Sequence, residues 1–169
     1  PDVWDALMRK IAGIAAAYLR IQVEAGASAV QLFDSWAGAL TPADYRASVM
    51  PHSERVLAAA GELGVPRIHF GVGTTNLLGL MGEAGADVVG VDWRTPLEQA
   101  IPLVGDRAVQ GNLDPTLVFA PTEVMTARAA EIIEAGRAAK GHIFNLGHGV
   151  IPSTDPDQLA ALTEFVHAY

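Results

Sequence analysis

Polar side chains and glycines gather where short apolar runs of the sequence end. An imidazole can donate or accept a proton, a serine hydroxyl can donate a hydrogen bond to a carboxylate, and an aspartate can accept hydrogen bonds. Groups of these types, brought together, could bind a polar ligand and deliver a proton to it. The run ends carry Asp34 and Ser35, Gly71 and Gly73, Asp92 and Arg94, Asn112 and Asp114, and Asn145 and His148, the last between Gly147 and Gly149.

Three of these residues also have structural explanations. His148 could hold its own loop through a backbone hydrogen bond, and Ser35 could cap the loop that follows its run. Asp34 is as able to accept from backbone N–H groups as to contact a ligand. Together the three would suggest a Ser-His-Asp hydrolase, but the chain has no G-x-S-x-G turn, which disfavours that chemistry.

Metal chemistry has little support in the sequence. The chain contains no cysteine, which excludes thiolate zinc sites and disulfides. Asp92 and Asp114 end two runs, where an aspartate caps the next helix more often than it binds a divalent cation. We expect the other histidines, which lack ligand spacing, to be structural or to face solvent: His52, His69, His142 and His167.

Five apolar runs, each followed by a helical pattern, must position the polar groups. The runs begin near residues 29, 67, 88, 108 and 143. Apolar strands that alternate with helices predict a parallel sheet covered on both faces. No G-x-G-x-x-G turn follows the first run, so an open dinucleotide-binding sheet is disfavoured and an α/β barrel is favoured. In a barrel the strand ends converge on one mouth, and we expect Ser35 and His148 to face one cavity there.

Two helical patterns stand out. Apolar residues recur every three or four positions from Val3 to Ala25, which predicts an amphipathic helix that ends at Gly26. Trp36 and Trp93, outside these helices, are expected to be packing anchors. A second helix after Pro121 places four residues on one face: Met125, Ala129, Ile132 and Gly136.

Length and charge set further limits. The chain has 169 residues and a net charge of −8, which argues against nucleic-acid binding. No apolar run approaches the roughly 18 residues that cross a bilayer, and we expect a cytoplasmic location. A complete barrel needs eight strands and typically about 250 residues. Residues 1–169 are therefore expected to form a single incomplete domain, the C-terminal portion of a (β/α)8 TIM barrel with about five βα units, cut from a longer protein.

Four of the run ends resemble, in order and spacing, motifs of the uroporphyrinogen decarboxylase family. They are Phe33–Gly38, Val89–Trp93, Gln110–Pro115 and Phe144–Gly149, and the resemblance runs from about residue 5 to the end. The resemblance implies a single-domain (β/α)8 barrel, usually a homodimer. It implies conversion of the four acetate side chains of uroporphyrinogen III to methyl groups, which gives coproporphyrinogen III in porphyrin and haem biosynthesis. The family uses neither a metal nor an organic cofactor.

The resemblance also implies roles for individual residues. Ser35 matches the family serine that contacts a substrate carboxylate. Apart from the resemblance, we expect Asp34, next to Ser35, to belong to the substrate-binding set. His148 matches the histidine of the N-L-G-H-G loop, at the substrate mouth, where it is expected to bind substrate and to help proton delivery. The family's N–H-binding aspartate, its arginines and its tyrosine lie in the N-terminal part. We therefore expect the parent protein to be the enzyme and this segment alone to be inactive.

Two alternatives remain open. Cobalamin-dependent methyltransferases of the same superfamily bind zinc through a His-x-Cys pair; His69 stands at the matching place, but glycine occupies position 71 and no thiolate exists in the chain. The second alternative is a non-catalytic barrel fragment that associates with another chain through open strand edges at 29–35 and 143–149.

Overall fold

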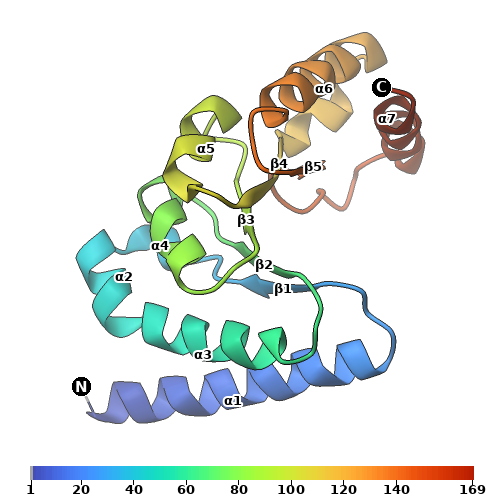
Figure 1. Cartoon of the computed structure of the whole chain (residues 1–169). Coiled ribbons are helices and arrows are strands. Elements are labelled where there is room, and N and C mark those ends of the chain that lie inside the picture. The colour runs from blue at the N-terminus through green and yellow to red at the C-terminus, as the bar shows by residue number, and fades with distance from the viewer. Residues whose placement is uncertain (1) are drawn as a thin grey trace. The chain divides into compact units, whose positions relative to one another are not determined.

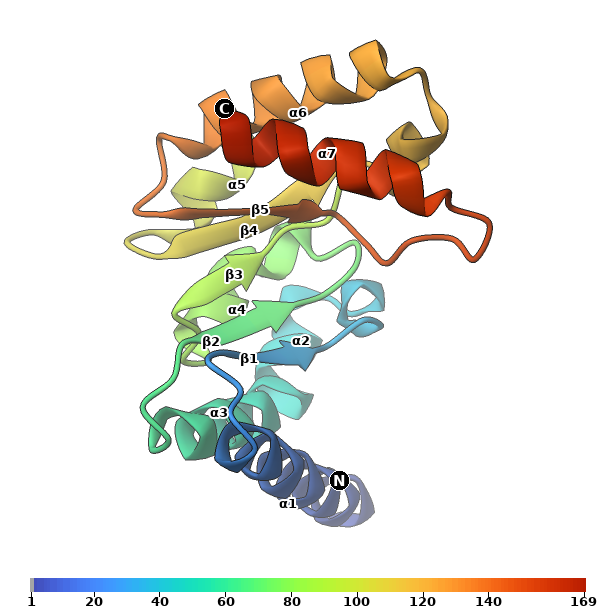
Figure 2. The ribbon, with the colours of Figure 1, turned by 90° about the vertical axis from the view of Figure 1, so that its right-hand side faces the viewer.

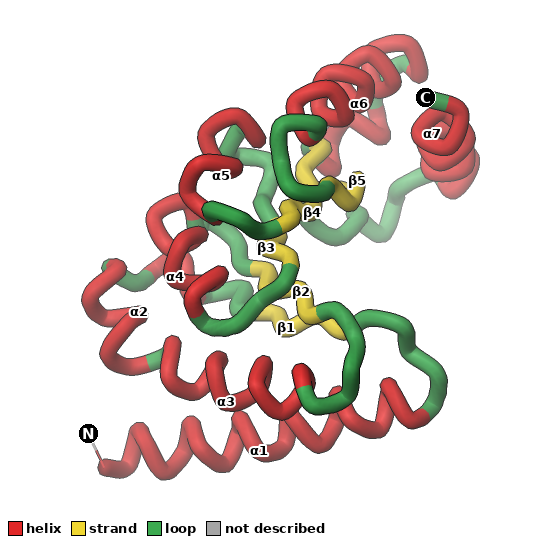
Figure 3. Tube along the Cα trace, in the orientation of Figure 1, coloured by secondary structure: helices red, strands yellow, loops and turns green. Residues whose placement is uncertain are grey.

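The computed structural model describes residues 2–169 as an alternation of strands and helices (Figures 1 and 3). The elements in chain order are α1 (Asp2–Glu24), β1 (Val30–Phe33), the 3-10 turn η1 (Ala37–Ala39), α2 (Pro42–Ser48), α3 (Met50–Gly61), β2 (Arg67–Phe70), η2 (Thr75–Leu77), α4 (Leu78–Glu83), β3 (Val88–Gly90), α5 (Leu97–Val104), β4 (Ala108–Leu113), η3 (Pro115–Phe119), α6 (Thr122–Gly136), β5 (His142–Leu146) and α7 (Pro156–Ala168).

The strands form one sheet whose order is the chain order, β1-β2-β3-β4-β5. β1 pairs with β2 in parallel, with Val30 opposite Arg67, and β4 pairs with β5 in parallel, with Val109 opposite His142. A doubly wound sheet reverses its strand order at a switch point, whereas neighbouring strands of a barrel follow one another along the chain. The order therefore confirms the α/β class and agrees with a portion of a barrel.

The chain divides into two compact units, residues 1–89 and 90–169. In the first unit α1 lies beside α3 (Figure 1), and a core cluster joins them to β1: Ala12, Leu19, Val30, Val56 and Ala60. In the second unit α7 lies beside α6, with β4 and β5 next to them (Figure 2). Among residues 2–169, no helix combines the length and the apolar content that crossing a bilayer requires.

Helix α1 confirms the predicted helix but not the burial of its apolar stripe. The large side chains of the stripe are exposed: Val3, Leu7, Ile11, Ile14, Tyr18 and Ile21. The helix packs through Ala12, Ala15 and Leu19 instead. Small alanines allow close approach of two helices, so the smoother face lies against α3 and the bulky face points outward.

Helix α6 has the predicted buried face. Its buried residues are Met125, Ala129, Ile132 and Gly136. Helix α7 has a side-chain cap, because the Asp155 side chain accepts a hydrogen bond from the Asp157 backbone N–H, 3.0 Å away.

Candidate functional site

The end of β1 is held against the loop that follows β2. The Asp34 backbone N–H donates to the Phe70 carbonyl at 2.7 Å, and the Asp34 carbonyl accepts from the Ala37 N–H at 3.0 Å. The loop after β2 passes close to Gly38, because a Cβ on Gly38 would lie 2.2 Å from the Val72 carbonyl oxygen. The chain after β1 therefore leaves the sheet in one defined direction, and Ser35 lies in this turn.

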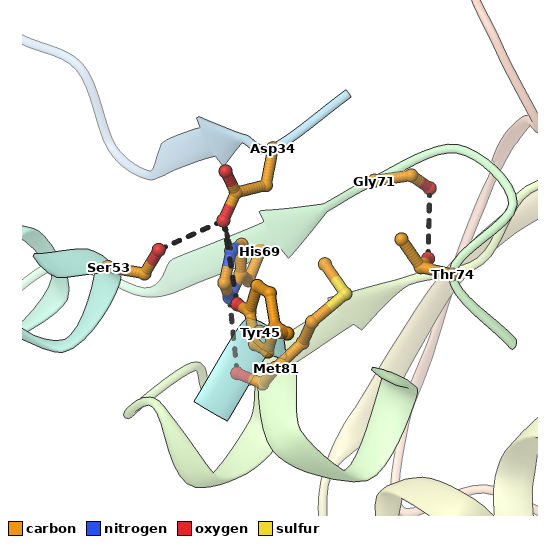
Figure 4. Close-up of polar contacts among 7 residues, drawn as sticks. All are labelled: Asp34, Tyr45, Ser53, His69, Gly71, Thr74 and Met81. Atoms are coloured by element: carbon orange, nitrogen blue, oxygen red, sulfur yellow. Dashed lines mark hydrogen bonds and ion pairs between the residues drawn. The ribbon is translucent and has the colours of Figure 1, made fainter. Parts of the chain in front are cut away.

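Asp34 accepts three side-chain hydrogen bonds from elements far along the chain (Figure 4). Ser53 Oγ on α3 donates at 2.9 Å, His69 Nε2 on β2 lies at 3.0 Å, and the Tyr45 hydroxyl on α2 donates at 3.5 Å. All three contacts end on Oδ2. Figure 4 shows the other carboxylate oxygen turned away from these three partners.

The partners of Asp34 are buried, and Asp34 itself is at the edge of the buried layer. The His69 side chain is 0% exposed and that of Asp34 is 23% exposed. Burial raises the pKa of the Asp34 carboxyl. The hydrogen bond and charge of His69, together with the hydrogen bonds from Ser53 and Tyr45, lower this pKa by more than burial raises it, so it lies below its usual value. Burial, and then the Asp34 charge, raise the pKa of Tyr45.

Ser35 is exposed beside this cluster, with two exposed aromatic side chains next to it. Phe33 contacts Phe70 edge-on, with 6.0 Å between ring centroids. Trp36 is 89% exposed, so the expectation that it anchors the core is wrong. Its backbone belongs to a turn whose buried member is Ala37, and the indole is left outside.

His148 lies in the second unit, in the loop after β5. Its ring meets the Trp93 ring edge-on at 6.0 Å, and the Arg94 guanidinium lies 3.8 Å from the centroid of the same indole. Arg94 also forms an ion pair with the buried Asp92 carboxylate at 2.8 Å. A Cβ on Gly147 would lie 2.3 Å from the Trp93 backbone nitrogen, so this glycine allows the loop to pack on Trp93.

The glycines that follow β2 and β5 divide into two kinds. At Gly71 and Gly147 the neighbouring space is filled by the chain itself, since a Cβ on Gly71 would lie 2.6 Å from Thr74. Gly73 and Gly149 border open space. Glycine is required at position 73 for a second reason, its φ of +67°.

Of the two aspartates that end apolar runs, Asp114 caps η3, as expected, whereas Asp92 holds the turn before α5 and does not cap that helix, whose N-cap is Pro96. The Asp92 carboxylate accepts from the Arg94 N–H at 3.0 Å, and the Asp114 carboxylate accepts from the Thr116 N–H at 2.8 Å. Across residues 2–169 there is no group of three or more His, Asp or Glu side chains that could hold a metal ion.

Of the predicted site residues, Asp34 and Ser35 lie together in the first unit and His148 lies in the second. A shared cavity for Ser35 and His148 stays a prediction. The second unit holds a cavity of about 550 Å³ lined partly by Trp93, Arg94 and Asn112, and His148 is not among its lining residues.

His69 is the site residue that sequence reasoning missed. Its spacing from the other histidines indicates no ligand role, but it contacts the carboxylate of Asp34, beside Ser35. A signal existed: β2 is apolar apart from Arg67 at its start and His69 one residue before its end. A histidine inside an apolar strand needs partners for both ring nitrogens, and strand ends are where such partners gather.

Comparisons with known proteins show the family of the chain. Residues 1–169 match the family model described as uroporphyrinogen decarboxylase. A uroporphyrinogen decarboxylase of Nocardioides sp. is 87% identical over 169 residues, which are 100% of this chain and 49% of that protein. The Streptomyces coelicolor relative of the same name is 60% identical over 168 residues, 99% of this chain and 47% of that protein. The chain thus spans about half the length of these relatives.

A solved structure shares the fold. A methyltransferase from Methanosarcina mazei superposes with a TM-score of 0.80 at 20% sequence identity, over 93% of this chain and 47% of the methyltransferase. At this identity the likeness concerns the fold alone.

Proposed function

Because the chain belongs to the uroporphyrinogen decarboxylase family, we propose that the full-length polypeptide that carries it converts uroporphyrinogen III to coproporphyrinogen III. The observation that carries the proposal is the match of residues 1–169 to the family, with the four resembling motifs at the carboxyl ends of β1, β3, β4 and β5. Barrel enzymes place their reacting groups at these ends.

The substrate supplies its own electron sink. Protonation of a pyrrole ring carbon makes the ring electron-poor, the acetate C–C bond breaks, and its electron pair enters the ring as carbon dioxide leaves. A proton added to the resulting exocyclic methylene gives the methyl group, and loss of the first proton restores the pyrrole. The protein has to hold the macrocycle and to deliver and remove protons, and no metal or organic cofactor is required.

Ser35 is proposed to donate a hydrogen bond to an acetate or propionate carboxylate. Its exposure after β1 and the exposed rings of Phe33 and Trp36 beside it support this role, since aromatic side chains provide apolar area for a macrocycle face. Asp34 is proposed to belong to the same binding set through the carboxylate oxygen that faces away from its three partners (Figure 4).

His148 is proposed to bind substrate at the mouth and to help deliver the proton. The packing of its loop on Trp93 restricts the position of the imidazole. Arg94 has a supporting role, because its ion pair with Asp92 compensates the charge of a carboxylate that would otherwise repel an anionic substrate. We further propose a cytoplasmic homodimer, in keeping with the family.

The alternatives have less support. Both ring nitrogens of His69 face oxygen atoms, the Met81 carbonyl and Asp34, so this histidine has no lone pair directed at a zinc ion. The fragment hypothesis applies to the chain by itself, whose strands β1 and β5 end the sheet order and whose α1 exposes a bulky apolar stripe.

The test is decarboxylation of uroporphyrinogen III by the full-length polypeptide under anaerobic conditions, followed by chromatography of the oxidised porphyrins. Four-fold decarboxylation is expected. Ser35→Ala should raise KM roughly tenfold, the loss of one hydrogen bond to a charged group. His148→Asn should lower kcat about a hundredfold, within the range of a lost general acid. Absence of product from the full-length wild type would overturn the proposal.

A further inference from the structure

The contacts of His69 indicate which of its two ring nitrogens carry a hydrogen. Nδ1 lies 3.2 Å from the Met81 carbonyl oxygen, and a carbonyl oxygen can only accept, so Nδ1 carries a hydrogen. Nε2 lies 3.0 Å from Asp34 Oδ2 (Figure 4). A ring nitrogen and a carboxylate oxygen at this distance share a proton, because two lone pairs facing each other would repel. The His69–Asp34 pair therefore holds one proton more than a neutral imidazole with a carboxylate anion.

The surroundings of Asp34 place that proton on His69. Oδ2 also accepts from Ser53 Oγ at 2.9 Å and from the Tyr45 hydroxyl at 3.5 Å. Three donors converging on one oxygen stabilise an ionised carboxylate, and the lowered pKa of Asp34 agrees. The other basic residue of β2, Arg67, is bound to Asp87 at 2.8 Å, so His69 is the basic residue of β2 that contacts Asp34.

The place of the His69–Asp34 pair next to Ser35 means that its net charge affects substrate binding. Asp34 directly precedes Ser35, the residue proposed to contact a carboxylate of a substrate that bears eight of them. An uncompensated anion next to that contact would repel the substrate, and a chain with net charge −8 adds to the repulsion. His69 is 0% exposed, so water screens its interaction with Asp34 little.

We propose that His69 is a positively charged positioning residue that fixes Asp34 and cancels its charge, so that an anionic tetrapyrrole can dock against Ser35. This inference rests on the proposed function for its kinetic consequence, whereas the charge state of His69 can be measured without any activity.

The charge state is tested by NMR of the full-length wild-type protein labelled with ¹³C and ¹⁵N, the His69 ring signals being assigned through their bonds to the His69 backbone. At pH 7 both His69 ring nitrogens should be protonated. A ring with an unprotonated Nε2 would overturn the inference, whether or not the protein decarboxylates uroporphyrinogen.

The charge compensation is tested by a double-mutant cycle on the full-length enzyme with uroporphyrinogen III. His69→Gln keeps a donor toward Asp34 but removes the charge, and should raise KM roughly tenfold while kcat changes less than about threefold. Adding Asp34→Asn removes the unpaired anion and should lower KM at least about threefold relative to His69→Gln alone. A merely structural role predicts that the double variant is at least as impaired as the single one, and that result would overturn the inference.

His52→Gln is the matched control. His52 is a second buried histidine of the same unit, on α3, 3.7 Å from Asp5 on α1. Its substitution should leave KM unchanged, and an equal rise in KM would contradict a specific role for His69. Thermal melts of each variant establish that it folds; if His69→Gln does not fold, the NMR measurement on the wild type still decides the charge state.

Discussion

Gly147 and Gly149 flank the same histidine but have different surroundings. A Cβ on Gly147 would lie 2.3 Å from the Trp93 backbone nitrogen, whereas nothing lies within 4 Å of a Cβ on Gly149. A methyl group at 147 forces the loop or the backbone of residue 93 to move, because neither neighbour is a flexible side-chain end.

We predict that Gly147→Ala lowers the free energy of unfolding of the full-length protein by about 1–3 kcal/mol. Gly149→Ala should change it by less than about 0.5 kcal/mol, as an exposed substitution away from packing contacts does. Urea unfolding of the two variants measures the difference. Equal effects at both positions would show that the Trp93 contact does not hold the loop.

The sequence predicted the contacts of some residues and not those of others. The cap Asp114 followed from its place at the end of a run, since capping depends on groups two or three residues away. The contact between Asp34 and His69 joins positions 35 residues apart in the chain, and no local pattern encodes it. Trp36 was expected to be packed and is exposed, because the average burial of tryptophan does not decide on which side of a turn its ring lies.

Helix α1 has two apolar faces, of which only one is packed in this structure. Leu19, on the packed face, is 6% exposed and belongs to the cluster with Val56 and Ala60. Ile14, on the outer face, is 62% exposed. The same helix therefore contains a core position and a surface position of nearly equal side-chain size.

We predict that Leu19→Ala lowers the free energy of unfolding of the chain by about 2–4 kcal/mol, through lost burial and the cavity that it leaves. Ile14→Ala should cost less than about 0.5 kcal/mol in the chain by itself. Chemical denaturation of the chain and the two variants checks the pair. A larger loss at Ile14 than at Leu19 would mean that α1 packs through its bulky stripe.

The elements themselves were largely predictable. The strands begin at residues 30, 67, 88, 108 and 142, each within one residue of the start of an apolar run. The periodicity of α6 also identified its buried face, because that helix has a single apolar stripe. In α1 the pattern contained both a bulky and a small-residue face, and periodicity cannot choose between them.

The whole chain spans about half the length of its relatives and carries a net charge of −8. A general negative field opposes the approach of an anionic tetrapyrrole, and the cations available to offset it are few. Arg94 is already paired with Asp92, and His69 with Asp34.

We therefore predict that the chain by itself binds uroporphyrin at least about a hundredfold more weakly than the full-length polypeptide, a difference of about 2.8 kcal/mol. Fluorescence titration of both proteins with uroporphyrin at one ionic strength measures it. Equally tight binding by the chain alone would refute the assignment of the main anion-binding groups to the other half.

The sequence by itself determined the family, the order of strands and helices, and the placing of Ser35 and His148 after β1 and β5, because periodicity, capping and motif spacing are local properties. Only the tertiary structure decided which oxygen acceptors His69 meets and which face of α1 is packed. Both depend on contacts between segments distant in the chain, where the need to pair buried polar atoms and to fit side-chain volumes selects one arrangement among several that the local pattern allows.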